Sequence, residues 1–267
     1  MPRPSLRLLT SSTVSKRRQS SLQRPQLSGR KCLITGASRG IGRAIAGRFY
    51  EEGATCLLVG RDESTLSEVV KQLSVTPQLH LGEGRNTGKR DVSYKVGDVS
   101  ERGFWEGLGE EVKDVDILVN AAGVAHSSLL LATKPALLQQ IVQTNLMGTM
   151  WGCQILVKNM VKKRAGCIIN VSSLLGIKGG RGSVAYSASK AGVLGLTRSL
   201  AAEVGQSNVR VNAIVPGYTE TQMTEGIPPF PVIFGLAPKG LDRSIYDKIA
   251  LCERKMCSRK ADNLHKE

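Results

Sequence analysis

Tyr186 and Lys190 are the pair of residues in this chain whose types and spacing most clearly suggest chemistry. They are four positions apart, so on a helix they share one face. A tyrosine with a pKa near 10 is a poor acid–base group at neutral pH unless a nearby cation favours its phenolate. Lys190 can supply that charge, and Ser173, expected at the carboxyl end of a strand, can hold a carbonyl oxygen. Alone, such a pair is usually a solvated helix face, so its meaning depends on the surrounding elements.

A phosphate-binding turn is predicted at residues 35–42, Thr-Gly-Ala-Ser-Arg-Gly-Ile-Gly. The apolar residues 32–34 before it suit a buried parallel strand. After it, Ile41, Ile45 and Phe49 recur at helical spacing. A strand, a glycine turn and a helix in this order let the backbone approach a pyrophosphate closely and offer it free N–H groups at the helix start. A dinucleotide site is therefore favoured over an ordinary glycine-rich turn.

The chain then alternates strands and helices, which predicts an α/β fold with a doubly wound, mainly parallel Rossmann sheet and helices on both faces. Strands are expected at 55–59, 92–96, 115–120, 166–173 and 209–214, and helices at 62–73, 101–112, 135–163 and 184–204. The polar, glycine-rich residues 81–91 are expected to form a surface insertion. The alternation places Ser173, Tyr186 and Lys190 beside the dinucleotide site.

The type of dinucleotide is suggested by the residues after the second expected strand. An acidic residue at that strand's tip would accept from the ribose 2′-hydroxyl, but Gly60 stands there, followed by Arg61. Arg39, in the glycine turn, is expected in the same region, so two guanidinium groups are available to hold a 2′-phosphate. NADP is therefore favoured over NAD, unless Asp62 or solvent takes up these charges.

Composition and charge indicate the location of the protein and which other classes of protein it does not resemble. The chain has 267 residues and a net charge of +15, and residues 1–28 hold five Arg and one Lys but no acidic residue. This Arg- and Ser-rich stretch resembles a mitochondrial presequence, with a basic disordered arm as the alternative. A mitochondrial matrix protein is therefore expected, with a cytoplasmic location as the alternative. No apolar run approaches the ~18 residues of a membrane span, and no aromatic platform for nucleic acid is present. The six cysteines form no Cys-x-x-Cys pair, so neither disulfides nor a metal site is expected.

From roughly Lys31 to Thr224 the chain resembles the classical short-chain dehydrogenase/reductase family. The matching motifs, in order, are Thr35-Gly36-x-x-x-Gly40-x-Gly42, Asp98, Asn120-Ala121-Ala122-Gly123, Asn145, Ser173, Tyr186-x-x-x-Lys190 and Pro216-Gly217. The resemblance implies that Tyr186 is the catalytic acid–base and that Ser173 orients the substrate carbonyl. It further implies that Lys190 binds the nicotinamide ribose and lowers the pKa of Tyr186, while Asn145 holds a water in a proton relay. Ser173, not Ser172, has the family's spacing of 13 before Tyr186.

Cofactor binding is implied for a larger set of residues. Taken with the two arginines discussed above, the resemblance assigns this role to Gly36, Ser38, Arg39, Gly40, Ile41, Gly42, Arg61, Asp98, Val99, Asn120, Ala121, Gly123, Tyr186, Lys190, Pro216, Gly217, Thr219 and Thr221. The cofactor implied is NADP.

Within the family, residues 170–173 and 218–224 look most like those of 3-oxoacyl-[acyl-carrier-protein] reductases. This implies NADPH-dependent reduction of a carrier-bound 3-oxoacyl thioester in fatty-acid synthesis, with a carbonyl, quinone or hydroxysteroid substrate as the alternative. An acidic acyl carrier protein is the expected partner, and the basic Lys162, Lys163 and Arg164 are expected to lie at a helix end near the site mouth. These three residues equally suit a favourable helix C-terminus. The family also implies a tetramer.

The resemblance fails after Thr224. The expected organisation is a presequence at 1–28, an NADP-binding catalytic domain at 29–225 and a divergent basic tail at 226–267. No glycine-terminated final strand is found in the tail, so the sheet edge and the cover over the substrate are in question. A second functional class therefore stays open, that of an inactive, nucleotide-binding truncated subunit.

Overall fold

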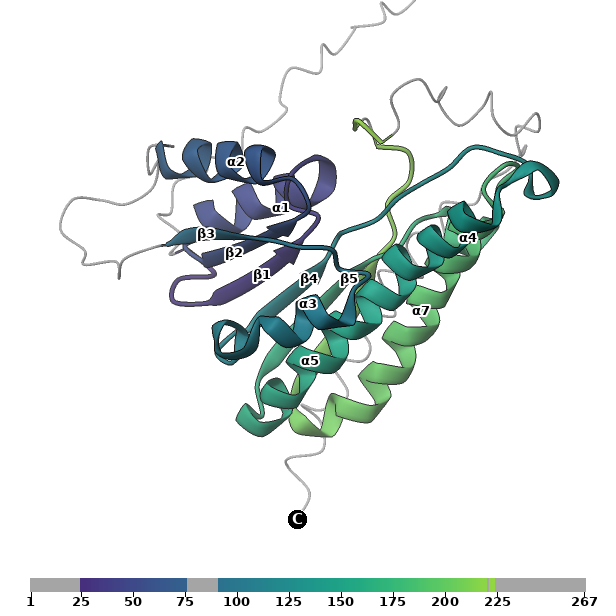
Figure 1. Ribbon diagram of the computed structural model, residues 1–267. Coiled ribbons are helices and arrows are strands. Elements are labelled where there is room, and N and C mark those ends of the chain that lie inside the picture. Colours follow the sequence, from purple (N-terminus) through teal and green to yellow (C-terminus); the bar gives the residue numbers. More distant parts are fainter. Residues whose placement is uncertain (1–24, 76–90, 220, 224–267) are drawn as a thin grey trace, which may run out of the picture.

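The computed structural model describes residues 25–75, 91–219 and 221–223. Its six strands are all parallel and form one sheet in the order β3-β2-β1-β4-β5-β6 (Figure 1). Their bounds are β1 Lys31–Thr35, β2 Thr55–Gly60, β3 Val92–Val96, β4 Ile117–Asn120, β5 Gly166–Val171 and β6 Val209–Ile214. The predicted doubly wound α/β sheet is confirmed, and each expected strand is present with its ends shifted by at most two residues.

The helices connect these strands as the hydrophobic spacing predicts. They are α1 Gly40–Glu51, α2 Glu63–Val75, α3 Arg102–Gly107, α4 Pro135–Val142, α5 Gly148–Lys163, α6 Leu175–Lys178 and α7 Val184–Val204, with short turns η1 Gly109–Val112, η2 Leu130–Ala132 and η4 Gly205–Ser207. Among the described residues no helix is long and apolar enough to span a bilayer.

The long helix expected at 135–163 is interrupted. Between α4 and α5 lies η3 (Gln143–Met147), a π-helical turn in which the Gly148 N–H donates to the Gln143 carbonyl. Turns of this width are rare and occur mostly as single insertions inside α-helices, frequently at functional sites. Here the turn contains Asn145, which is fully buried.

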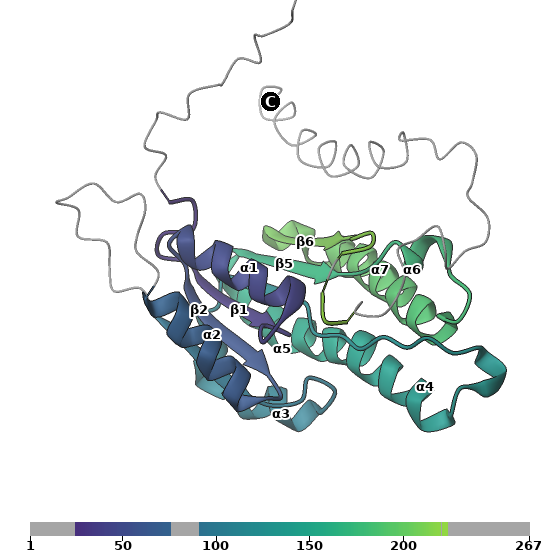
Figure 2. The same cartoon turned by 90° about the horizontal axis from the view of Figure 1, so that it is seen from above.

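Two hydrophobic cores pack on the two faces of the sheet. Leu33, Leu118 and Ile168 face α3, α5 and α7, where Trp105 and Leu156 are buried. On the other face Ile34 and Leu58 pack against α1 and α2, among the residues Ala46, Leu66 and Val69. Figure 2 shows α1 and α2 together over one part of the sheet. The four inner strands β2, β1, β4 and β5 are thus buried on both sides, which is typical of a parallel sheet, while the outer strands β3 and β6 each have exposed side chains.

The order in which the chain adds strands reverses between β1 and β4, and open α/β sheets bind ligands at such a point. Thr35 ends β1 and pairs in register with Asn120, which ends β4. The Thr35 hydroxyl accepts hydrogen bonds from the N–H groups of Ala121 and Ala122, both at 3.1 Å. The glycine turn after β1 and the small-residue loop after β4 are therefore held together at this edge.

The chain N-terminal to β1 joins the folded body over four residues that the sequence placed in the leader. The Leu27 N–H donates to the Glu52 carbonyl at 2.9 Å, and the Gln26 N–H donates to the Glu52 carboxylate at 3.0 Å. Leu27 also packs against the core under α1 and α2. Residues 1–24, 76–90, 220 and 224–267 lie outside the described residues, so the expectations for the leader before residue 25, for the insertion at 81–91 up to residue 90 and for the tail at 226–267 stay predictions.

Candidate active site

The glycine turn between β1 and α1 has the backbone geometry that a close-lying phosphate requires. Gly36 has a φ of +65°, and a Cβ at this position would lie 2.7 Å from the Ala122 Cα. A Cβ on Gly42 would lie 2.2 Å from the Gly36 carbonyl oxygen. Both positions therefore require glycine, because a side chain on Gly36 would meet the loop after β4 and one on Gly42 would meet the backbone of the turn itself. The first N–H groups of α1 have no partner within the helix and are available to an anion.

Ser173, Tyr186 and Lys190 are brought together at the carboxyl end of β5. All three line the same pocket as the glycine turn. Lys190 is 4 % exposed, and its Nζ donates to the Val171 carbonyl at 2.8 Å. The same Nζ lies 5.8 Å from the centre of the Tyr186 ring. The Ser173 Oγ accepts from the Leu175 N–H at 3.2 Å, and the Ser173 hydroxyl is also hydrogen-bonded to Tyr186.

Burial shifts the pKa values of both Tyr186 and Lys190. It raises the pKa of Tyr186 above its ordinary value, and a hydrogen bond with Ser173 opposes that rise. It lowers the pKa of Lys190 from 10.5 to about 8, because the charged ammonium loses water inside the protein. The expected lowering of the Tyr186 pKa is not found in the chain alone, since desolvation is the larger effect. At neutral pH Tyr186 therefore carries its proton, and most of Lys190 stays charged.

Asn145 holds the loop after β4 against α7. Its Oδ1 accepts from the Val124 N–H at 2.8 Å, and its Nδ2 donates to the Val124 carbonyl at 2.9 Å and to the Ser189 Oγ at 3.1 Å. Ser189 in turn donates to the Tyr186 carbonyl at 2.7 Å. The side chain thus fixes Val124, which lines the pocket, and connects it to the helix that carries Tyr186. The water that the family resemblance implies for Asn145 stays a prediction.

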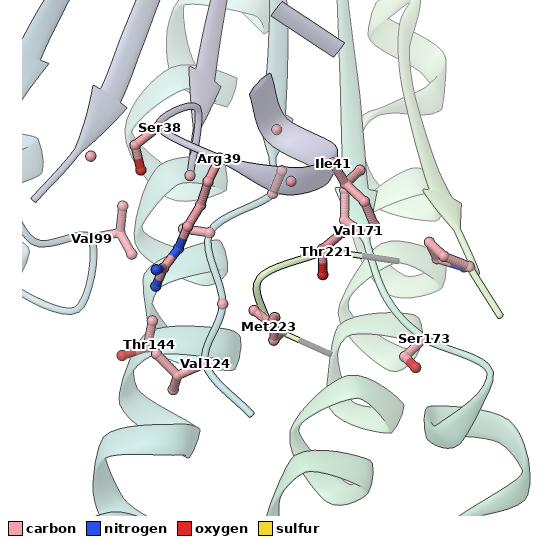
Figure 3. Close-up of a pocket in the computed structure, with 18 of the residues that line it drawn as sticks. Ser38, Arg39, Ile41, Val99, Val124, Thr144, Val171, Ser173, Thr221 and Met223 are labelled. Carbon is pink, nitrogen blue, oxygen red and sulfur yellow. The ribbon is translucent and has the colours of Figure 1, made fainter. Parts of the chain in front are cut away.

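The other end of the pocket is basic. Arg39 and Arg61 both line it, near Gly60 at the tip of β2. Arg61 is half exposed, and its guanidinium lies 3.8 Å from the Asp98 carboxylate. The other oxygen of Asp98 accepts from the N–H and hydroxyl of Ser100 at 2.9 and 2.8 Å, which fixes the carboxylate. Figure 3 shows Arg39 extending from the turn toward Val99.

Most of the residues predicted to bind the cofactor line this single pocket. They are Gly36, Ser38, Arg39, Gly40, Ile41, Gly42, Arg61, Asp98, Val99, Ala121, Gly123, Tyr186, Lys190, Pro216, Gly217, Thr219 and Thr221. The segment after β6 crosses the pocket between the glycine turn and Ser173, as the positions of Thr221 and Met223 show (Figure 3). A Cβ on Gly40 would touch the Thr221 side chain at 3.4 Å, so this segment packs directly on the turn.

Asn120 and Asn145 are absent from the pocket lining. The Asn120 side chain lies in the core beneath the sheet, where its Nδ2 donates to the Asn170 Oδ1 at 2.9 Å. Asn170 continues this buried chain of hydrogen bonds by donating to the Thr197 hydroxyl at 2.9 Å. The Asn120 amide therefore ties β4 to β5, and its contribution to the cofactor site is to place the loop that follows it.

The chain matches the family model described as short chain dehydrogenase over residues 30–230. It belongs to the short-chain dehydrogenase/reductase family. A 3-oxoacyl-[acyl-carrier-protein] reductase from Thermotoga maritima is 38 % identical over 203 residues, covering 76 % of this chain and 79 % of that protein. Carbonyl reductase family member 4 from Danio rerio is 36 % identical over 198 residues, covering 74 % and 79 %. As a member of this family, the chain is an oxidoreductase that uses a nicotinamide cofactor.

Solved structures give the same assignment. A 3-oxoacyl-[acyl-carrier protein] reductase from Brucella melitensis superposes with a TM-score of 0.68 at 32 % identity, covering 77 % of this chain and 75 % of that one. A protein described as an NAD(P)-dependent gluconate 5-dehydrogenase from Beutenbergia cavernae, solved with NADP at low occupancy, gives a TM-score of 0.68 at 31 % identity, covering 76 % and 78 %. The predicted likeness to 3-oxoacyl reductases is confirmed among these relatives.

Several pocket residues of this dehydrogenase/reductase were not predicted as site residues. They are Gly60, Gly97, Ala122, Val124, Thr144, Val171, Ser172, Gln222 and Met223. Gly60 ends β2 and Gly97 follows β3, directly before Arg61 and Asp98. Their position at the carboxyl ends of these strands could have identified them as pocket residues. Thr144 precedes Asn145 in the π-turn, and no residue pattern marks that turn in advance.

The prediction that Lys162, Lys163 and Arg164 lie near the mouth of the pocket of the same chain is wrong. The helix α5 runs antiparallel to the strands, so its carboxyl end lies at the amino edge of the sheet (Figure 1). There Lys163 contacts the Val115 carbonyl at 3.4 Å and Asp116 at 3.7 Å. Arg164 donates to the Gln206 carbonyl at 2.9 Å. The pocket lies at the opposite, carboxyl edge.

Within residues 25–75, 91–219 and 221–223, no group of three or more His, Cys, Asp or Glu side chains is arranged to hold a metal ion. Cys32, Cys56, Cys153 and Cys167 are buried free thiols, and burial raises the pKa of Cys56 and of Cys153 to about 12. These four thiols are therefore inert core residues.

Proposed function

We propose that this short-chain dehydrogenase/reductase reduces 3-oxoacyl thioesters to 3-hydroxyacyl thioesters with NADPH, as a step of fatty-acid synthesis. The observation that carries the reductive chemistry is the convergence of Ser173, Tyr186 and Lys190 beside the glycine turn. The thioester substrate and its acyl carrier protein come from the names of the Thermotoga maritima and Brucella melitensis relatives.

The residues present suit a nicotinamide cofactor. The glycine turn and the start of α1 would hold its pyrophosphate, and Lys190 lies where its Nζ can reach the ribose of the nicotinamide. When bound, the reduced cofactor supplies the hydride. The chain itself must then hold the carbonyl and supply a proton to its oxygen.

Ser173 and Tyr186 have complementary parts in that step. The Ser173 hydroxyl, which is held by the Leu175 N–H and hydrogen-bonded to Tyr186, would donate its proton to orient the carbonyl oxygen once a substrate is bound. Tyr186, whose pKa is raised by burial, keeps its proton at neutral pH and can donate it to that oxygen. A protonated tyrosine suits reduction, since oxidation of an alcohol would instead need a base. The charge of Lys190 stabilises the phenolate that forms.

Selection of NADPH is proposed on the basic end of the pocket. Arg39 and Arg61 line it, and Gly60 leaves no carboxylate there to bind a free ribose hydroxyl. The NADP in the Beutenbergia cavernae structure is consistent with this choice.

The proposal is tested with the purified full chain, NADPH and an acetoacetyl thioester, with a quinone and a ketosteroid as competing substrates. We expect the thioester to give the highest kcat/KM. Tyr186→Phe keeps the ring and removes the hydroxyl, so turnover should fall by about 10²–10⁴-fold while NADPH binding persists. Preference for the quinone would instead support the second candidate, a carbonyl reductase, which the Danio rerio relative favours. NADPH binding without any turnover would support the inactive-subunit hypothesis.

The basic leader supports a mitochondrial matrix location as part of the same proposal. Because Leu27 packs into the core, we place the end of the removable leader before Pro25. Fusing residues 1–24 to a fluorescent protein should direct it to mitochondria, and a cytoplasmic distribution would contradict this location. The tetramer implied by the family is tested in parallel by size-exclusion chromatography of the full chain.

A further inference from the structure

Lys190 is held from two sides by the end of β5. The Lys190 Nζ donates to the Val171 carbonyl at 2.8 Å. The backbone carbonyl of Lys190 accepts from the hydroxyl of Ser172, the residue after Val171, at 2.8 Å. Both bonds connect α7 to consecutive residues of one strand end. The bond from Ser172 is additional to the hydrogen bond that this carbonyl accepts as part of the helix.

Ser172 is itself fixed. It is 3 % exposed, and its N–H donates to the Ile214 carbonyl of the neighbouring strand at 2.9 Å. A serine held by its backbone in the sheet and by its hydroxyl on a helix carbonyl defines the distance between the two elements. That distance decides where the Lys190 side chain begins.

Gly176 brings α6 into the same contact. A Cβ at this position would lie 2.7 Å from the Lys190 carbonyl carbon and 2.9 Å from the Ala191 nitrogen. The backbone of α6 therefore rests directly on the backbone of α7 at Lys190. Ser172 and Gly176 approach the same peptide unit, one with a hydrogen bond and the other by close packing.

We propose that Ser172 is a positioning residue of the reductase. Its hydroxyl bonds the Lys190 carbonyl to the end of β5 and so fixes the position of Lys190 relative to the pocket. The proposal rests on the proposed function. Ser173, the neighbour of Ser172, lines the pocket as the residue that orients the substrate carbonyl. The two adjacent serines therefore have different roles, since Ser173 acts on the substrate and Ser172 positions Lys190.

Without the Ser172 bond, α7 can shift relative to β5 at Lys190, although Asn170 still bonds to Thr197 further along the helix. The Lys190 Nζ then loses its fixed place between the Val171 carbonyl and the nicotinamide ribose.

The first test is Ser172→Ala in the full-length chain, measured by NADPH binding, which needs no carbonyl substrate. We expect NADPH affinity to fall by about 10-fold or more, since small displacements of positioned groups are costly. We also expect the alkaline limb of NADPH binding, near pH 8 in the parent from Lys190, to move upward as the ammonium becomes less buried.

Gly176→Ala is the second variant, because it separates α6 from α7 at the same peptide unit without touching the Ser172 hydroxyl. We expect the same loss of NADPH affinity and the same shift of the alkaline limb.

Thr197→Val is the matched control. It removes the buried hydroxyl of Thr197, seven residues after Lys190, which donates to the Val193 carbonyl at 2.7 Å and accepts from Asn170 of β5 at 2.9 Å. The control therefore also breaks a hydrogen bond between β5 and α7, but away from Lys190.

The control should lower the melting temperature and leave the pH profile of NADPH binding unchanged. The proposal is overturned if Ser172→Ala keeps the parent's NADPH affinity and alkaline limb, or if Thr197→Val moves them equally. Should Ser172→Ala fail to fold, Ser172→Cys, which keeps a side chain of similar size and replaces the hydroxyl with a weaker donor, decides by the same two criteria. Failure of the thioester assay in the parent would reject the proposed substrate and would leave these binding measurements valid.

Discussion

Arg61 provides the sharpest test of how this reductase selects its cofactor. The change is Arg61→Ala, which removes the guanidinium at the tip of β2 and leaves Arg39 in place. We expect weaker NADPH binding and unchanged NADH binding, because only NADPH carries a 2′-phosphate. The affected group is local, since Arg61 lies at the pocket edge with its side chain 51 % exposed.

The size of the effect follows from two opposing contacts. A hydrogen bond between charged groups contributes about 1.5–3 kcal/mol. The phosphate must, however, share Arg61 with Asp98, whose carboxylate lies 3.8 Å away. An exposed ion pair of this kind contributes about 0.2–1 kcal/mol, so the net loss should be about 1–2 kcal/mol. This corresponds to a loss of about 5–30-fold in NADPH affinity.

Fluorescence titration with NADPH and NADH measures the discrimination directly. Arg43→Ala is the matched control, because Arg43 is a nearby arginine of α1 that bonds to Gln72 and does not line this pocket. Raising the ionic strength should weaken NADPH binding more than NADH binding. Equal affinities for the two cofactors in the parent, or an equal loss for both in Arg61→Ala, would refute the assignment of Arg61 to the phosphate.

Two further predictions concern stability. The buried Lys190 ammonium destabilises the native state below pH about 8; as the pH rises from about 8 to 10.5 the native state loses this proton before the unfolded state does, so stability should rise across that window. Urea unfolding should show this rise in the parent and not in Lys190→Met, and parallel pH curves would contradict it. Removing residues 1–24 should leave the melting temperature unchanged, whereas removing 1–28 should lower it, because Leu27 packs into the core; equal melting temperatures for the two truncations would show that this contact is dispensable.

The fold was predictable because each strand and helix has its own strong local pattern. The strand at 209–214 and the helix at 184–204 were predicted with the bounds that the structure has. The break at Asn145 was not, because a π-turn differs from an α-turn only by one backbone hydrogen bond, and residues 143–147 have no glycine or proline to mark it.

Errors in the predicted site came from side-chain direction and burial. Asn120 ends β4 beside the cofactor loop, yet its side chain points into the core toward Asn170. The basic cluster at 162–164 was placed at the wrong edge, although a helix that crosses between parallel strands must run antiparallel to them. The pKa of Tyr186 depends on how deeply its ring is buried, which residue types alone do not give.

The edge strand β6 bears on the inactive-subunit hypothesis. Val209 and Val211 are buried on the face covered by α7, while Arg210 is exposed and Asn212 partly exposed on the other face. Ile214 alternates onto this same face and is 37 % exposed, so the face is polar at two of its three positions and leaves one large apolar side chain partly in water. Beyond this strand, Pro216, Gly217 and Thr219 still line the pocket. The described body therefore has a pocket that holds the reactive residues together, which favours an active reductase over a passive nucleotide-binding subunit.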